Sequence, residues 1–218
     1  MILKELATAW AETLSRITGE TDQYKIALAR YMVESLLSML LSLLFVIILG
    51  LLFGVLRTAL LLTLVVMILK SVMGGLHLAT PLRCALVGGA MTIILSHLAL
   101  VLPFGQIPKL VQLWVFVLAL FIVWKKAPLE AKGKPLTAEQ QKGLSLASRI
   151  LIVLITVICW CWPQAFGINE LFYGMVFQVL SLTKPMAWAL AGIDQQINRG
   201  HDKFKGISRI KIERRIEK

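Results

Sequence analysis

The chain has 218 residues, of which 58% are hydrophobic and 16% are charged, and its mean hydropathy is +0.79. A soluble domain averages roughly 45–50% apolar and about 25% charged residues, so this composition excludes an ordinary soluble protein and indicates an integral membrane protein. The formal net charge of +11 would suggest nucleic-acid binding in a soluble protein. Here the basic residues gather between apolar runs, where they set membrane topology, and no nucleic-acid partner is expected.

Residues 1–32 are predicted to form a cytoplasmic amphipathic segment, and they lack the compact apolar core of a signal peptide. Two interpretations of this segment are open: a helix that lies in the membrane interface, or a helix that covers the membrane core from the cytoplasmic side. The apolar residues that recur at spacings of three and four are Leu3, Leu6, Trp10, Leu14 and Ile17.

Residues 33–191 contain apolar runs that approach the roughly 20 residues a helix needs to cross a bilayer. The runs are continuous rather than alternating, so they predict an all-α membrane domain and not a β-barrel. Lys184-Pro185 interrupts the last run, which allows that span to end there and an interfacial helix to follow. The six predicted transmembrane helices are Val33–Gly54, Val55–Val72, Ala85–Leu102, Ile107–Trp124, Leu146–Trp162 and Leu171–Leu190.

Positive charges alternate between rich and poor connections along the chain. The N-terminal segment, the second connection, the basic loop 125–145 and the basic tail 192–218 are rich in Lys and Arg, whereas the first, third and fifth connections are poor. The positive-inside rule then predicts that both termini and the loop 74–84 lie on the cytoplasmic side. We expect a multi-pass protein of the bacterial cytoplasmic membrane whose loop thiol lies in a reducing compartment.

The loop 74–84 reads GGLHLATPLRC and separates two long apolar runs. Its two glycines favour a turn after the second span, and Thr80 followed by Pro81 fits the N-cap and first residue of the third span. Cys84 then falls in the first turn of that helix. Free backbone N–H groups, the positive end of the helix dipole and the adjacent Arg83 favour the thiolate there, which is the nucleophilic form of cysteine.

His77 precedes Cys84 by seven residues, which on an unbroken helix is roughly 10 Å and too far for proton transfer. Because Pro81 and the glycines break the helix, the chain can fold back and bring the imidazole to the sulfur. A Cys–His pair is the minimum for nucleophilic acyl transfer, with the backbone N–H of Cys84 as the candidate oxyanion donor. The ordinary alternative is a loop without chemistry, in which the cysteine packs as a small apolar residue.

The order Gly-Gly-x-His, six residues, then Cys resembles the signature of the accessory gene regulator B (AgrB) family. A second match lies in the fourth connection, where KAPLEAKGKPL, residues 126–136, fits the family's Ala-Pro and Lys-Pro-Leu pattern. That family comprises bacterial membrane cysteine endopeptidases that process quorum-sensing peptide precursors. The resemblance covers nearly the whole chain up to Gly200, and Leu78 stands where the family usually has alanine.

The resemblance implies that Cys84 is the nucleophile and that His77 takes the thiol proton and gives it to the leaving amine. The product would be an acyl-enzyme thioester. A cysteine or serine inside the precursor would then displace Cys84 and close a thiolactone or lactone ring, without ATP. A partly dry site at the membrane edge favours ring closure over hydrolysis. No cofactor and no metal is expected.

The resemblance also implies a peptide precursor with an amphipathic N-terminal helix and an acidic C-terminal part. Membrane lipids are a further expected partner, through the basic tail, and a homodimer is a family expectation. For the basic residues, the alternative to substrate binding is that they only set topology. The candidate substrate-binding residues are Lys70, Gly75, Lys125, Lys126, Lys132 and Lys134.

A rival interpretation is a small transporter or channel without covalent catalysis, in which His97, Arg57 or Lys184 would line a path. Transporters often show repeated halves or paired broken spans, and neither is clear in this sequence. A third interpretation is a non-catalytic membrane scaffold with a lipid-binding tail. Cys159 and Cys161 are expected to pack in the membrane rather than to form a redox pair.

Overall fold

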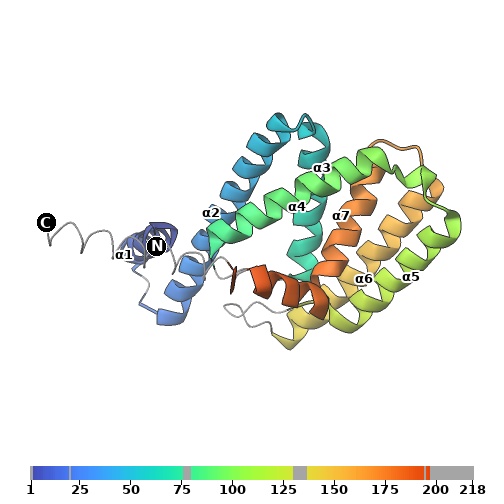
Figure 1. Ribbon diagram of the computed structural model, residues 1–218. Coiled ribbons are helices and arrows are strands. Elements are labelled where there is room, and N and C mark those ends of the chain that lie inside the picture. The colour runs from blue at the N-terminus through green and yellow to red at the C-terminus, as the bar shows by residue number, and fades with distance from the viewer. Residues whose placement is uncertain (1, 20, 76–79, 130–136, 194, 197–218) are drawn as a thin grey trace, which may run out of the picture.

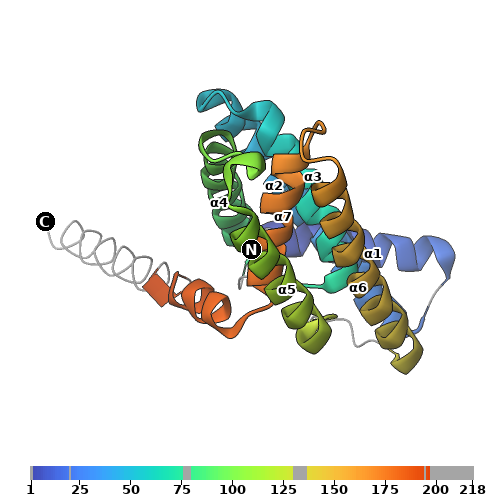
Figure 2. The same ribbon diagram turned by 90° about the vertical axis from the view of Figure 1, so that its right-hand side faces the viewer.

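The computed structural model of the protein describes residues 2–19, 21–75, 80–129, 137–193 and 195–196. The all-α fold predicted from the apolar runs is confirmed over these ranges (Figures 1 and 2). The elements in chain order are α1 (Ile2–Thr18), α2 (Gln23–Leu52), α3 (Leu56–Met73), α4 (Pro81–Val101), the 3₁₀ turn η1 (Phe104–Gln106), α5 (Lys109–Lys126), α6 (Ala138–Cys161) and α7 (Ile168–Ser181).

The N-terminal segment 1–32 divides between two helices. Gly19, with a φ of 67°, follows α1, and the side chain of Asp22 accepts a hydrogen bond from the backbone N–H of Tyr24 (2.9 Å) at the start of α2. The stretch after this cap contains no Gly or Pro, so nothing stops the helix before the first apolar run. α2 therefore begins well before the predicted span limit at Val33.

α1 packs against α2 through the small side chains of Ala7 and Ala11, which are buried. Its larger apolar side chains form a stripe that stays exposed. This exposure fits the interfacial interpretation, because a helix that covered the membrane core would bury the stripe. The exposed residues of the stripe are Leu6, Trp10, Leu14 and Ile17.

A tight turn joins α2 to α3. Gly54 adopts a φ of 68°, and the backbone N–H of Val55 donates to the carbonyl oxygen of Gly50 (2.9 Å). A Cβ at Gly50 would lie 3.0 Å from the Cα of Leu56, so the missing side chain allows the two helices to approach closely. The turn lies where the predicted spans Val33–Gly54 and Val55–Val72 adjoin.

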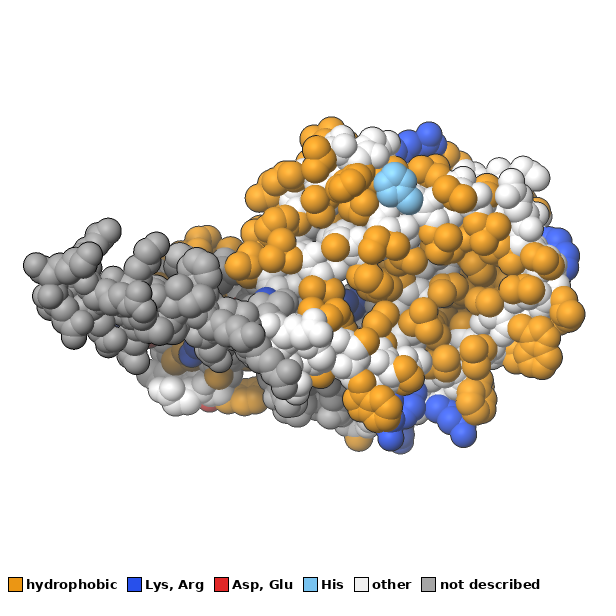
Figure 3. All heavy atoms as spheres, viewed as in Figure 1, with side chains coloured by type: hydrophobic (Ala, Val, Ile, Leu, Met, Phe, Trp, Pro, Cys, Tyr) orange, Lys and Arg blue, Asp and Glu red, His pale blue; other side chains and the backbone are white. Residues whose placement is uncertain are grey.

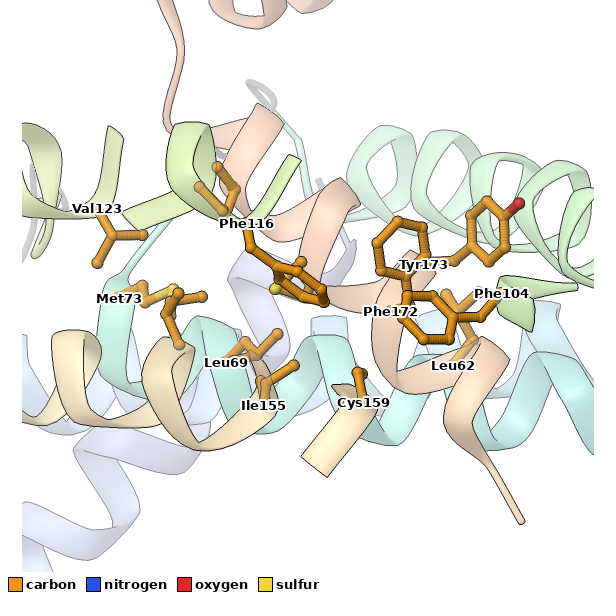
Figure 4. Packing of buried hydrophobic residues seen from close by; sticks show 14 of the residues in the cluster. Leu62, Leu69, Met73, Phe104, Phe116, Val123, Ile155, Cys159, Phe172 and Tyr173 are labelled. Atoms are coloured by element: carbon orange, nitrogen blue, oxygen red, sulfur yellow. The ribbon is translucent and has the colours of Figure 1, made fainter. Parts of the chain in front are cut away.

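α3 is the central helix of the bundle and contacts α2, α4, α6 and α7. Buried apolar side chains from α3, α5, α6 and α7 meet in one cluster, and a smaller cluster joins α2, α3 and α4. Because lipid is as apolar as these side chains, van der Waals packing holds the helices together within the membrane. Members of the large cluster labelled in Figure 4 include Leu62, Leu69, Met73, Phe104, Phe116, Val123, Ile155, Cys159, Phe172 and Tyr173.

Buried and partly buried hydrogen bonds hold the connections at the end of the bundle remote from Cys84. The side-chain amide of Gln112 donates to the carbonyl oxygen of Phe104 (2.9 Å), whose own N–H donates to Oδ1 of Asn169 (2.9 Å). The hydroxyl of Tyr173 donates to the carbonyl oxygen of Leu102 (2.7 Å). These bonds satisfy backbone groups where the chain leaves the helical form, as apolar surroundings require.

Apolar side chains cover much of the helical surface, and Lys and Arg side chains gather mostly at its margins (Figure 3). α2, α3, α4 and α6 are long and apolar enough to cross a membrane, and α7 with the segment Lys184–Ile193 adds a fifth span if the pair counts as one. α5 carries Lys109, Lys125 and Lys126 at its ends within 18 residues. The protein is therefore a multi-pass membrane protein with four or five candidate spans. Six spans and two cytoplasmic termini stay predictions.

The last predicted span, Leu171–Leu190, is bent. α7 ends at Ser181, and the helical segment Lys184–Ile193 follows at an angle of 82°. Pro185 lies in the first turn of that segment, where its missing N–H costs no helical hydrogen bond. The interruption expected at Lys184-Pro185 is confirmed.

Candidate active site

Cys84 lies in the first turn of α4, as the sequence predicts, and is half-buried. Thr80 caps this helix: its hydroxyl accepts a hydrogen bond from the backbone N–H of Arg83 (3.4 Å), and Pro81 follows as the first helical residue. The backbone N–H of Cys84 donates to the carbonyl oxygen of Thr80 (3.0 Å). The expectation that this N–H serves as an oxyanion donor is therefore wrong, because the first helical turn already uses it.

The glycine turn before α4 is fixed by a distant segment of the chain. The backbone N–H of Leu129 donates to the carbonyl oxygen of Met73 (2.9 Å), and Gly74 forms a parallel bridge with Leu129. Gly74 has a φ of 71°, and a Cβ there would overlap the carbonyl oxygen of Leu129. Both the backbone conformation and the close approach therefore require glycine at this position.

Gln178 of α7 holds the same turn from the other side. Its side-chain amide donates to the carbonyl oxygen of Gly74 (2.7 Å) and lies 3.6 Å from where a Cβ of Gly75 would be. Only 1% of Gln178 is exposed. Sequence reasoning missed this residue, although a single glutamine in an apolar helix is a signal, because a polar side chain in a membrane requires a partner.

Lys70, at the end of α3, lies beside the glycine turn. Its Cε would be 3.3 Å from a Cβ at Gly75, and its side chain lies near enough to Cys84 for their charges to interact. The structure thus brings together three of the predicted site residues, Lys70, Gly75 and Cys84.

Two other candidate substrate-binding residues, Lys125 and Lys126, line a separate hollow of about 380 Å³ between the end of α5 and the start of α6. Among the residues that the structure describes, nine line the hollow, and they include four cations and no carboxylate. We call this feature the basic hollow; it is lined by Lys125, Lys126, Ala127, Pro128, Gln141, Lys142, Ser145, Leu146 and Arg149. Three further predicted residues, His77, Lys132 and Lys134, lie outside the described residues.

The residues that would support a transport path lie on the surface. His97, Arg57 and Lys184 are exposed; the His97 ring meets Phe53 edge-on, with a centroid distance of 6.3 Å. Of the two cysteines in α6, Cys159 is buried in the large apolar cluster, whereas Cys161 is exposed. The packing role predicted for Cys159 is confirmed.

Both sequence motifs that carry the family resemblance meet at this site, because Leu129 follows Ala127-Pro128 and bonds to the residue before the Gly-Gly pair. The model of the family described as accessory gene regulator B matches residues 7–182. The chain belongs to the AgrB family. Membership implies a part in the processing of quorum-sensing peptides, with a peptide precursor as the substrate. No match was found among curated proteins or among solved structures.

Proposed function

We propose that this AgrB-family chain is a membrane cysteine endopeptidase that cleaves a quorum-sensing peptide precursor through a Cys84 thioester and promotes its cyclisation. The observation that carries the proposal is the setting of the thiol. Cys84 is half-buried in the first turn of α4, and the Lys70 ammonium interacts with it. A nearby lysine and the start of a helix are surroundings in which proteins place nucleophilic cysteines.

In the proposed reaction, His77 accepts the proton of the Cys84 thiol, and the sulfur attacks a peptide carbonyl of the precursor. The carbon–nitrogen bond breaks, and the imidazolium returns the proton to the leaving amine. A cysteine or serine side chain inside the precursor then attacks the thioester and releases the Cys84 thiol. The ring that closes is a thiolactone or a lactone, and no bond energy from ATP is consumed.

We propose that the precursor lies across the glycine turn. Lys70 and Gly75 would contact the segment near the scissile bond, because Lys70 lies near Cys84 and beside Gly75, and Gly75 adds no side-chain bulk. The acidic part of the precursor would be attracted over a longer range by the positive field of Lys125 and Lys126, joined by Lys132 and Lys134. This attraction weakens as salt concentration rises.

The proposed location is the bacterial cytoplasmic membrane, with the site on the cytoplasmic side. The charge pattern supports this orientation, since the connections near Cys84 are richer in Lys and Arg than those at the other end. The proposed assembly is a homodimer in contact with membrane lipids.

The test is co-expression of the full chain with a candidate precursor, followed by mass spectrometry of the peptide products. Cys84→Ala should abolish release of the C-terminal segment, and His77→Ala should reduce it nearly as far. Cys161→Ala is the matched control, because it removes an exposed thiol at the other end of the bundle, and it should process normally. Release by Cys84→Ala at the wild-type rate would refute the mechanism.

A second measurement separates the covalent mechanism from simple hydrolysis. Hydroxylamine cleaves thioesters, so adding it during turnover should yield the precursor's N-terminal part as a hydroxamate in place of the ring. A product that carries only a free carboxylate under these conditions would show that no thioester forms.

A further inference from the structure

The basic hollow concentrates positive charge beside the membrane-facing surface of two helices. α5 and α6 lie side by side in both views (Figures 1 and 2), and the hollow opens where α5 ends and α6 begins. Its described lining contains four cations, Lys125, Lys126, Lys142 and Arg149, and no Asp or Glu. Four cations in one hollow of about 380 Å³, with no acidic side chain among the lining residues that the structure describes, favour an anionic occupant.

Among these four cations, Arg149 has a side chain that is held in place by an aromatic ring. Its guanidinium carbon lies 4.0 Å from the ring centroid of Trp124, so the guanidinium plane is held by the indole. Its Nε–H is buried and has no hydrogen-bond partner within the described residues. A buried donor without an acceptor is costly, and an arginine fork binds a phosphate through two parallel hydrogen bonds.

The flank of the hollow is apolar and faces outward. The Lys125 ammonium lies 4.7 Å from the ring centroid of Phe121, which is 54% exposed, and Trp124 is 60% exposed. Leu146 and Ile150 continue this exposed surface along α6. The cations thus end where a lipid-facing surface begins, which is the arrangement that a molecule with a charged head and apolar chains would fit.

We propose that the basic hollow binds the phosphate group of an anionic phospholipid from the leaflet that faces the α5–α6 connection. The phosphate accepts hydrogen bonds from Arg149 and pairs with Lys126 and Lys142, while the acyl chains lie along Phe121 and Trp124. A phosphodiester carries one negative charge, so four cations still leave the surface positive. Lipid binding does not depend on the peptidase mechanism proposed above, whereas the effect of the lipid on peptide release rests on it.

The bound lipid would also stabilise the candidate active site. Ala127 and Pro128 line the hollow, and the next residue, Leu129, donates to Met73 and bridges to Gly74. A headgroup that holds the end of α5 therefore limits motion of the segment that fixes the glycine turn. Peptide release should be faster in vesicles that contain the anionic lipid.

The experiment uses the purified full chain in neutral detergent and measures lipid retained on the protein by native mass spectrometry. Phosphatidylglycerol should be retained about fivefold more than phosphatidylcholine. Arg149→Gln should lower phosphatidylglycerol retention about fivefold. Lys142→Gln, at an exposed position that does not threaten folding, should lower it as well. Size-exclusion chromatography checks that each variant is folded.

Arg57→Gln is the matched control, because Arg57 also stacks on an aromatic ring, that of Phe166 at 4.4 Å, but lies outside the hollow. It should retain phosphatidylglycerol as the wild type does. Unchanged retention by both Arg149→Gln and Lys142→Gln would overturn the proposal. So would displacement of the lipid by inorganic phosphate, which indicates a free-phosphate site, or by poly-glutamate, which indicates a peptide site.

Discussion

The two ends of the helix bundle are built differently. At the end formed by η1 and the connection from α6 to α7, aromatic rings and buried hydrogen bonds of Gln112, Asn169 and Tyr173 close the structure. At the end that holds Cys84, the turn is fixed by a backbone bond from Leu129 and a side-chain bond from Gln178. Packing of many side chains holds the first end together, whereas individual hydrogen bonds fix the second end.

Because of this difference, we expect the aromatic end to govern the stability of the fold and the glycine turn to govern peptide release. Changes in the aromatic end should lower the free energy of unfolding and leave the thiol unaffected in the molecules that stay folded. Changes at the glycine turn should impair peptide release while most of the bundle stays intact, since few packed side chains are lost there.

The largest effect on stability is expected for Phe172→Ala. The Phe172 ring lies within 5.0 Å of Phe104, 5.8 Å of Phe116 and 5.3 Å of Tyr173, measured between centroids. Its loss should cost about 3–5 kcal/mol in the free energy of unfolding, measured by denaturant titration in detergent. Phe166→Ala, at an exposed position, should cost under about 1 kcal/mol. Equal costs for the two variants would contradict the proposed division between the ends.

Gly74→Ala should have the largest effect on peptide release at the other end. Its methyl group would overlap the carbonyl oxygen of Leu129, and alanine is strained at a φ of 71°. We expect release to fall about 100-fold, equivalent to roughly 3 kcal/mol. Gly88→Ala, where a Cβ meets no atom within 4 Å, is the matched control and should retain activity.

A pair of buried glutamines gives a direct comparison of the two ends. Gln178→Leu leaves the carbonyl oxygen of Gly74 without its partner, and release should fall about tenfold, or roughly 1.4 kcal/mol. Gln112→Leu removes the bond to Phe104 at the aromatic end. It should lower the unfolding free energy by about 1 kcal/mol without slowing release. Both quantities should be measured for both variants, and a slow Gln112→Leu enzyme would show that the two ends are coupled.

The smallest expected effect belongs to Lys70. In a Cys159→Ala, Cys161→Ala background, iodoacetamide labels only Cys84, so the labelling rate reports the thiolate. Lys70→Gln should slow labelling about fivefold, because it removes the cation near the sulfur. Lys70→Arg should restore most of the rate, and Lys184→Gln should leave it unchanged. Faster labelling of Lys70→Gln would mean that the ammonium does not stabilise the thiolate.

Local rules predict much of this fold. The apolar runs locate the helices because lipid requires continuous hydrogen-bonded helix. Thr80 and Pro81 fix the start of α4 through their own backbone chemistry, and Pro185 marks the bend after α7. These features depend on neighbouring residues and can therefore be read from the chain itself.

Contacts between distant segments were not predictable in the same way. The residues around Leu129 in the sequence do not indicate that it pairs with Gly74. Those around Gln178 do not indicate that its side chain bonds to the same residue. The spacing of Lys70 and Cys84 likewise does not reveal their proximity, because it depends on how α3 packs beside α4. The family resemblance grouped the right motifs, but only packing shows that they meet through Leu129.

The exposed apolar stripe of α1 has to be covered by the lipid or detergent that surrounds the protein. Ala7 and Ala11 are buried, while Trp10 and its neighbours in the stripe are not covered by the residues that the structure describes and need an apolar surface. A flat lipid disc supplies that surface over the whole length of the helix, whereas a small, strongly curved micelle touches only part of it. The choice between disc and micelle during purification therefore decides how firmly the N-terminal helix is held.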